Sequence, residues 1–255
     1  MLSNTRIVEY QRSNPGQSLL ADRTFFRFLL ARSLGEPVLA PLEPVSASDT
    51  FVRHRVFAQY HRAGVLRGDE SLSGPGSSMG QTDIIRRALP PLLGRLGVRS
   101  LLDAGCGDFN WMRQIVGVLD HYTGVDLIPE LIERNRRRYQ SDRREFHCRD
   151  IAETDLPRAD MILCRDTLVH YSLAGAQTVL RNLQRTGSHY LLATTFPGRG
   201  TNDDIPLGGW RPLDVAAPPF SFPPPLHLIV ENCTEMGGRY ADKSLGVWAL
   251  QELVL

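Results

Sequence analysis

The 255-residue chain is predicted to have an α/β fold built on a mostly parallel sheet. From Ser100 onward, short apolar segments with strand character alternate with longer segments whose apolar residues recur at helical spacing. This alternation is typical of parallel strands joined by right-handed crossovers, with helices on both faces of the sheet. The last two apolar segments have no helix-length segment between them, which predicts a C-terminal antiparallel hairpin.

The alternating pattern predicts seven strands. They are expected at 100–105, 121–127, 145–151, 159–166, 189–196, 226–233 and 245–253. Helices are expected at 110–119, 129–140 and 174–187, where Pro129 suits a first helical turn and Gly187 a helix end. A loop rich in proline and glycine, at 197–225, separates the fifth strand from the hairpin.

The region before this pattern is expected to form a helical lid. Residues 1–90 are assigned to the N-terminal extension and residues 91–255 to the main domain. Helices are expected at 24–34, 49–64 and 82–97, with a proline-rich linker at 35–49. Pro90 is expected to kink or split the third of these helices, because it lacks the N–H group that a helix interior needs.

Composition argues against several classes of partner. The formal net charge of +1 predicts no overall field that would gather nucleic acid or an anionic membrane. The four cysteines lack the paired spacing of a zinc site. Cys148, Cys164 and Cys233 lie in apolar runs and are predicted to be reduced core thiols. No apolar run approaches the ~20 residues of a transmembrane helix. We therefore expect a cytoplasmic protein with no nucleic-acid or membrane partner and no metal; its oligomeric state, a homodimer included, stays open.

The stretch SLLDAGCGDFNWM, at 100–112, carries the main functional signal. Gly105 and Gly107 lie between a predicted strand and a predicted helix, as in nucleotide-binding turns, although Asn110 replaces a third glycine. The next two strands each end near an acid, Asp126 and Asp150. Because parallel strands end at the same edge of a sheet, these acids are expected to line one crevice. There Asp126 suits ribose hydroxyls and Asp150 an adenine amino group.

The acids beside the glycine turn indicate which nucleotide binds. Asp103 and Asp108 would place two negative charges next to a dinucleotide pyrophosphate. A like-charge pair at ~4 Å costs on the order of a few kcal/mol even when screened. S-adenosylmethionine (SAM) has an ammonium and a sulfonium at this point and no phosphate. We therefore expect SAM, with Asp103 holding its ammonium directly or through water.

These motifs resemble those of the class I, Rossmann-like SAM-dependent methyltransferases. The resemblance is carried by LLDAGCGDF, GVDL, CRDI and the terminal strand pair, and covers about 100–255. CGDFNWM, CRDTLVHYS, GGWRPLD and YADKSLGVW are similar to a bacterial subgroup of unknown substrate. The resemblance implies a Rossmann-like three-layer sandwich with SAM as cofactor. The candidate cofactor contacts are Asp103, Gly105, Gly107, Asp108, Asp126, Leu127, Asp150, Ile151 and Arg165.

The end of the fourth strand supplies the candidate catalytic residues. Asp166 and His170 are four apart, so both would lie on one face of a helix that began at Asp166. His170 would then accept a proton and Asp166 would orient it. The alternative is structural: Asp166 caps a helix and His170 forms a local hydrogen bond. Arg165 either binds an acidic group or forms a local salt bridge.

Two loops supply candidate substrate contacts. Trp210 and Arg211 lie in the long loop, where they suit an aromatic wall and an anion clamp; the alternative is a buried tryptophan in a proline-stiffened cover. Ser77 and Gln81 lie in a Gly/Ser-rich segment that either closes over the ligand or is a flexible linker.

The sequence thus predicts a SAM-dependent methyltransferase acting on a small molecule by O- or N-methylation, in metabolite, natural-product or sugar tailoring. The alternatives are an RNA or protein methyltransferase and a non-catalytic SAM-binding protein. The basic run at 133–144 is read as a solvated helix face, since it lacks the interleaved aromatic residues of RNA-binding surfaces.

Overall fold

A computed structural model describes residues 50–65 and 67–255. The helix and linker expected at 24–34 and 35–49 lie outside the described residues. Among the described helices, none has both the length and the apolar character needed to span a bilayer.

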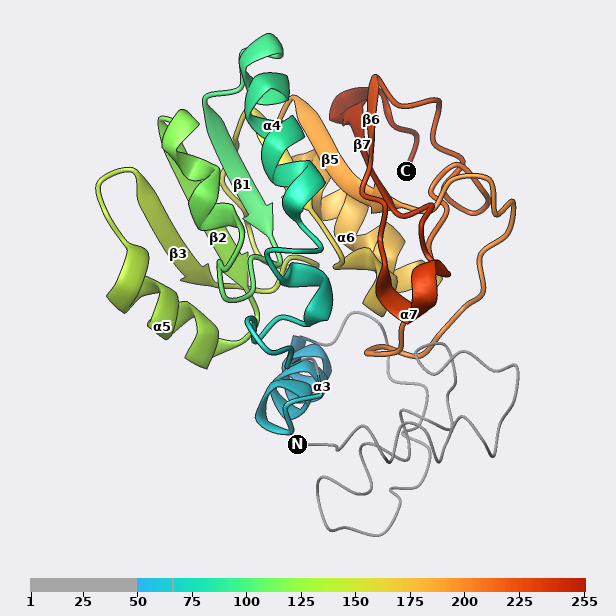
Figure 1. Ribbon diagram of the computed structural model, residues 1–255. Coiled ribbons are helices and arrows are strands. Elements are labelled where there is room, and N and C mark those ends of the chain that lie inside the picture. The colour runs from blue at the N-terminus through green and yellow to red at the C-terminus, as the bar shows by residue number, and fades with distance from the viewer. Residues whose placement is uncertain (1–49, 66) are drawn as a thin grey trace, which may run out of the picture.

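The core is a seven-stranded sheet in the order β3-β2-β1-β4-β5-β7-β6 (Figure 1). The strands are β1 (Ser100–Ala104), β2 (His121–Asp126), β3 (Arg144–Cys148), β4 (Met161–Cys164), β5 (Tyr190–Thr195), β6 (His227–Val230) and β7 (Ser244–Ala249). The pairings among the first five are parallel, whereas β7 is antiparallel to both β5 and β6. The predicted parallel sheet with a C-terminal antiparallel hairpin is therefore confirmed.

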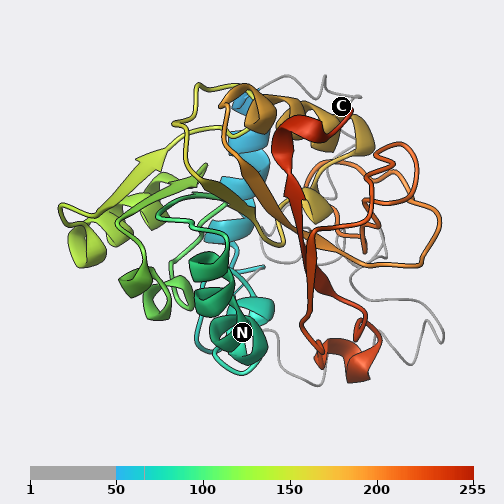
Figure 2. The ribbon, with the colours of Figure 1, turned by 90° about the horizontal axis from the view of Figure 1, so that it is seen from above.

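Helices cover both faces of the sheet (Figures 1 and 2), and a hydrophobic layer lies on each face. In β1, Leu101 faces the layer formed with α4 (Asp83–Arg95) and α5 (Pro129–Tyr139). Leu102 faces the layer formed with α6 (Leu173–Arg185). Successive residues of a strand point to opposite faces of the sheet, so β1 contributes side chains to both cores. This arrangement is typical of a three-layer α/β sandwich.

The segment between β1 and β2 differs from the expectation. In place of an α-helix at 110–119 there are two short 3-10 helices, η2 (Met112–Gln114) and η3 (Val116–Val118). Phe109 adopts a positive φ of 60°, which rules out an α-helical start there. The segment instead buries Met112, Ile115, Val116 and Leu119 in the core against the sheet.

The helix α4 also differs from the expectation, since Pro90 and Pro91 lie inside it without splitting it. Ile85, Leu89, Leu92 and Leu93 are all buried in the core against β1. This packing offsets the loss of two helical hydrogen bonds. The proposed division between residues 90 and 91 falls within α4.

Two segments that precede the sheet lie at the carboxyl ends of its strands. The helix α3 (Thr50–Arg62) confirms the helix expected at 49–64, and Figure 1 shows it across this edge of the sheet. Residues 71–77 approach the same edge, where Ser71 and Ser73 contact Asp108. Cys148 is exposed on the edge strand β3, so the expectation of a core thiol is wrong for this residue.

Candidate active site

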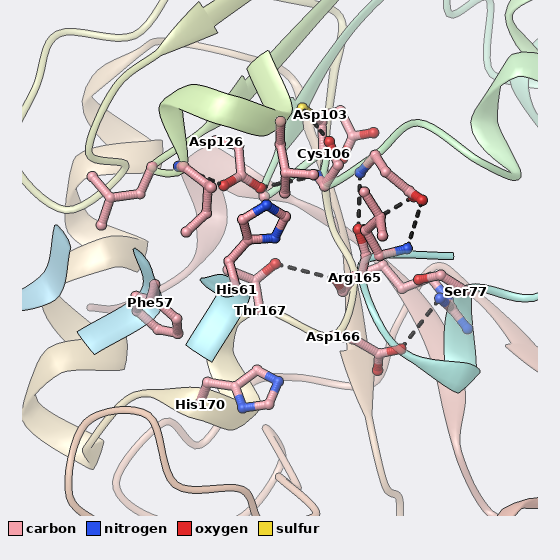
Figure 3. Close-up of a pocket in the computed structure, with 18 of the residues that line it drawn as sticks. Phe57, His61, Ser77, Asp103, Cys106, Asp126, Arg165, Asp166, Thr167 and His170 are labelled. Carbon is pink, nitrogen blue, oxygen red and sulfur yellow. Dashed lines mark hydrogen bonds and ion pairs between the residues drawn. The ribbon is translucent and has the colours of Figure 1, made fainter. Parts of the chain in front are cut away.

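A cavity of about 150 Å³ opens at the carboxyl ends of β1, β2 and β4. Figure 3 shows its lining. The lining residues are Phe57, His61, Leu72, Ser73, Ser77, Asp103, Gly105, Cys106, Gly107, Asp108, Asn110, Trp111, Asp126, Leu127, Ile128, Leu131, Arg149, Ile151, Arg165, Asp166, Thr167, His170 and Tyr171.

The glycine turn forms the floor of the cavity. Gly105 and Gly107 have φ values of 98° and 54°, a region that favours glycine. A Cβ atom at Gly105 would collide with the Thr167 side chain, and one at Gly107 with Ser73. Both glycines are therefore required by conformation and by close approach of neighbouring loops.

Asp103 is buried at the end of β1. The Tyr122 hydroxyl donates to its Oδ2 at 2.7 Å. Burial, and secondarily the charge of Asp126, raise the pKa of Asp103 to about 7, whereas Tyr122 and Arg165 oppose the rise. A carboxylate held at this cost is suited to pair with a cation.

Asp126 is held by the backbone at the end of β2. Its Oδ2 accepts from the Gly107 N–H at 2.9 Å, and its Oδ1 accepts from the Ile128 N–H at 3.0 Å. Each carboxylate oxygen retains further acceptor capacity, and the side chain lines the cavity. Burial raises the pKa of Asp126. Figure 3 shows His61 of α3 beside it.

Asp150 does not line the cavity, so its expected contact with adenine is not supported. Its Oδ2 accepts from Arg53 Nε at 2.7 Å and its Oδ1 from the Ala152 N–H at 2.9 Å. Both charged side chains are fully buried. Asp150 therefore anchors α3 to the sheet, while Leu127, Ile151 and Arg149 line this end of the cavity.

Asp108 lines the cavity, but its carboxylate binds the segment 71–73. It accepts from Ser71 Oγ at 3.0 Å, the Leu72 N–H at 2.8 Å and Ser73 Oγ at 3.2 Å. Its role in this structure is to dock that segment onto the glycine turn.

The expected helix at Asp166 does not form, so the proposed pairing of Asp166 with His170 is corrected. Asp166 has a positive φ of 53°, a 3-10 helix η4 spans Leu168–His170, and α6 begins at Leu173. Asp166 instead pairs with Lys243, and with Arg165 at 3.2 Å. Neither member of the pair caps a helix.

His170 keeps a geometry suited to a base. Its Nδ1 lies 2.8 Å from the Gly209 carbonyl oxygen, which can only accept, so Nδ1 carries the proton in the neutral ring. The other nitrogen, Nε2, is then unprotonated, and it points toward the Asp166 side of the cavity (Figure 3). Burial lowers the pKa of His170, which keeps the ring neutral near pH 7.

Arg165 forms local salt bridges at the cavity wall. Its Nη2 lies 2.7 Å from Glu231 Oε2, and its guanidinium lies over the Trp111 ring at 5.4 Å. The position at the cavity is as expected, but the charge of Arg165 is already paired.

Of the four candidate substrate residues, only Ser77 lines the cavity. Gln81 donates to Thr234 Oγ1 at 2.7 Å, away from the cavity. Trp210 is half-buried and packs edge-on against Tyr240, with ring centroids 4.7 Å apart. Arg211 is buried and donates from Nη1 to the Tyr171 carbonyl at 2.6 Å. Trp210 and Arg211 therefore support the loop rather than line this cavity.

Several residues at the site escaped the sequence reasoning. Phe57 and His61 line the cavity from α3; their spacing of four on one predicted helix was an available signal. Glu231 and Lys243 come from the hairpin and hold Arg165 and Asp166. Lys243 is the only lysine in the sequence, which was also visible beforehand.

Comparison with known protein families also indicates a methyltransferase domain. Residues 101–187 match a family model described as a methyltransferase domain. The search of curated proteins found no match.

Solved structures with detectable similarity include three methyltransferases. The methyltransferase domain of bacterial CtHen1-C is 16% identical, with a TM-score of 0.41, over 45% of this chain and 66% of that one, just under two thirds of its length. Magnesium protoporphyrin IX methyltransferase from Synechocystis PCC 6803 with bound SAM is 15% identical, with a TM-score of 0.46, over 64% and 83%. The N-methyltransferase NodS from Bradyrhizobium japonicum WM9 with S-adenosylhomocysteine is 17% identical, with a TM-score of 0.42, over 55% and 72%.

The family match lies on the part of the sheet that carries the glycine turn, Asp103 and Asp126. Residues 101–187 are therefore similar to a methyltransferase domain, and they form part of the seven-stranded sheet of a Rossmann-like α/β fold.

Proposed function

We propose that the protein is a SAM-dependent methyltransferase that methylates a hydroxyl or amine of a small molecule. The observation that carries the proposal is the composition of one cavity. Asp103, Asp126 and the glycine turn lie along one side, and His170, with an unprotonated Nε2, lies at the end of β4. Groups that could bind an adenosine linked to an amino acid, and a side chain that could accept a proton, thus line the same cavity.

In this proposal the residues orient the cofactor along the carboxyl edge of the sheet. Asp126 accepts the ribose hydroxyls, while Leu127 and Ile151 contact adenine. Asp103 pairs with the ammonium, and Gly105 and Gly107 allow the methionine end to approach the backbone. This orientation directs the sulfonium toward Asp166 and His170.

Bound SAM supplies an electrophilic methyl group on a good leaving group. The protein therefore has two remaining tasks: to align the acceptor with the methyl carbon and to take up its proton. Alignment alone contributes ~7–11 kcal/mol in favourable systems. As the acceptor oxygen bonds to the methyl carbon, the carbon–sulfur bond breaks with its electrons retained on sulfur. His170 Nε2 takes the hydroxyl proton and later releases it to water.

The covering segments favour a small acceptor over RNA or protein. Phe57, His61 and Leu72 line the cavity from segments that precede the sheet. The formal net charge of +1 provides no overall field that would gather nucleic acid. We place the protein in the cytoplasm on its four unpaired cysteines.

The test is transfer of tritium-labelled methyl from SAM into separate small-metabolite, RNA and protein fractions. Label in the metabolite fraction alone supports the proposal. Label in RNA or protein alone, or SAM binding with no transfer to any fraction, contradicts it.

A further inference from the structure

Four charged side chains interlock at the wall of the cavity beside His170, and we call them the charge cluster: Arg165, Asp166, Glu231 and Lys243. Arg165 pairs with Glu231 at 2.7 Å and with Asp166 at 3.2 Å. Lys243 pairs with Asp166 and lies 3.7 Å from Glu231. Such clusters are weak evidence for stability, because apolar replacements of similar volume are often equally stable. The cluster therefore invites a functional explanation.

Asp166 is the member through which the charge cluster meets a ligand. Its side chain is 27% exposed, against 5% or less for the other three. Lys243 and Arg165 both contact Oδ2, whereas among residues 50–65 and 67–255 the contact of Oδ1 is with Thr194 Oγ1 alone, at 3.5 Å. Oδ1 thus retains acceptor capacity for a ligand.

The backbone also fixes Asp166 in place. Its φ of 53° is rare for a residue other than glycine, and its N–H donates to Thr194 Oγ1 at 2.8 Å. Backbone conformations of this kind cost of order 1–3 kcal/mol and concentrate at functional sites. Left-handed backbone, buried ion pairs and contact with the cavity all converge on this one carboxylate.

The charge balance of the cluster indicates the kind of acceptor. Two cations face two carboxylates, and Glu235 adds a further acid near Arg165. No surplus positive charge remains for an acidic acceptor. A donor such as a hydroxyl meets a free carboxylate oxygen, and the rings of Phe57, Trp111 and Tyr171 supply apolar walls for a carbon skeleton.

The identity of residue 243 adds an independent observation. The chain has 29 Lys and Arg residues, and Lys243 is its only lysine. It is buried, pairs with Asp166 and does not line the cavity. A compact ammonium there fixes Oδ2 without the planar fork of an arginine, which would compete for both carboxylate oxygens.

We infer that Asp166 Oδ1 accepts a hydrogen bond from a second hydroxyl of the acceptor, next to the hydroxyl that His170 deprotonates. Lys243 is a positioning residue that acts through Asp166. The acceptor is then a neutral polyol of the sugar type. This inference rests on the proposed function and narrows its substrate class.

The first arm of the test measures binding of a defined panel to the protein saturated with S-adenosylhomocysteine. The panel contains methyl hexopyranosides, their single-deoxy analogues and the matching uronic acids, followed by ligand-observed NMR. At least one neutral glycoside should bind, and loss of one particular hydroxyl should weaken it about 10-fold or more. No binding by any neutral glycoside, or preference for the uronic acids, overturns the inference.

The second arm compares variants. Asp166→Ala should leave the Kd for S-adenosylhomocysteine within about twofold, and should reduce the discrimination between glycoside and deoxy analogue to about twofold. Lys243→Met should weaken glycoside binding, and Lys243→Arg should not fully restore it. Asp142→Ala, an exposed acid, is the matched control. If Asp166→Ala still discriminates fully between the glycoside and its deoxy analogue, the inference is overturned. If the unaltered protein does not bind S-adenosylhomocysteine, the proposed function is overturned instead.

Discussion

At the scale of single residues, Asp103 shows how function and stability conflict at this site. Its pKa of about 7, in place of an ordinary 3.8, corresponds to a cost of about 4 kcal/mol for ionising it in the free protein. The folded state binds this proton more tightly than the unfolded state. The associated stability is therefore complete below pH 3.8 and is lost as the pH rises through 7.

Asp103→Asn removes this cost, so the free variant should have a higher Tm than the parent at pH 8 and little difference at pH 4. The same change should weaken SAM binding by at least 10-fold, since the ammonium loses its counter-charge. Thermal unfolding at both pH values and calorimetry with SAM measure the two effects. An unchanged Kd would show that Asp103 does not hold the ammonium.

A second residue-scale prediction concerns pH. SAM affinity should fall as the pH drops below about 7, as Asp103 becomes protonated. The turnover number at saturating SAM should instead follow His170, whose pKa is lowered by burial, and should fall only below pH 6.5. His170→Ala should lower turnover about 100-fold with little change in the Kd for SAM. If the turnover number of His170→Ala still falls below pH 6.5, another residue is the base.

Sequence reasoning at this scale located acids at strand ends better than it located their partners. The glycine turn and Asp126 could be placed because strand ends are set by local pattern. The partner of Asp150 could not be predicted in this way. Its counter-ion, Arg53, lies 97 residues earlier, and no local pattern specifies that contact. The left-handed backbone of Asp166 was equally invisible, since it depends on Thr194 and Lys243.

At the scale of elements, α3 is held to the sheet by buried charge. Arg53 binds Asp150 at 2.7 Å and also pairs with Glu153 beyond β3. Removing one partner of a buried pair leaves an uncompensated charge, at a cost of about 3–5 kcal/mol. Phe57 and His61 reach the cavity from this helix, so the pair also positions the cover of the site.

Arg53→Met and Asp150→Asn should each lower the free energy of unfolding by about 3–5 kcal/mol, and the double variant by clearly less than the sum. Urea denaturation of the four proteins completes the cycle. Additive effects would mean that the two side chains do not stabilise each other.

The elements themselves were largely predictable from periodicity, which reads burial on one face. The seven strands and the helices α5 and α6 follow from it. The 3-10 helices after β1 and the unbroken α4 do not, because packing against the sheet decided both.

At the scale of the whole molecule, two segments from before the sheet cover a cavity built by the sheet. Their attachments run through Arg53–Asp150 and through Asp108, which holds residues 71–73. A ligand that fills the cavity contacts both covers, so binding should order them together.

Saturation with S-adenosylhomocysteine should therefore slow amide hydrogen exchange at 53–61 and 71–77 as well as in the glycine turn. At a concentration 100 times its Kd, it should raise the free energy of unfolding by about 2.7 kcal/mol. Asp126→Ala should remove both effects, and the exposed control Asp142→Ala should retain them. Slower exchange confined to the glycine turn would argue against a covering role.

The most direct test of the central claim is a crystal structure of the protein with S-adenosylhomocysteine. We predict ribose hydroxyls on Asp126, the ammonium within reach of Asp103, and the sulfur facing His170 and Asp166. Adenosine bound outside this cavity, or bound with its sulfur directed away from His170, would contradict the account.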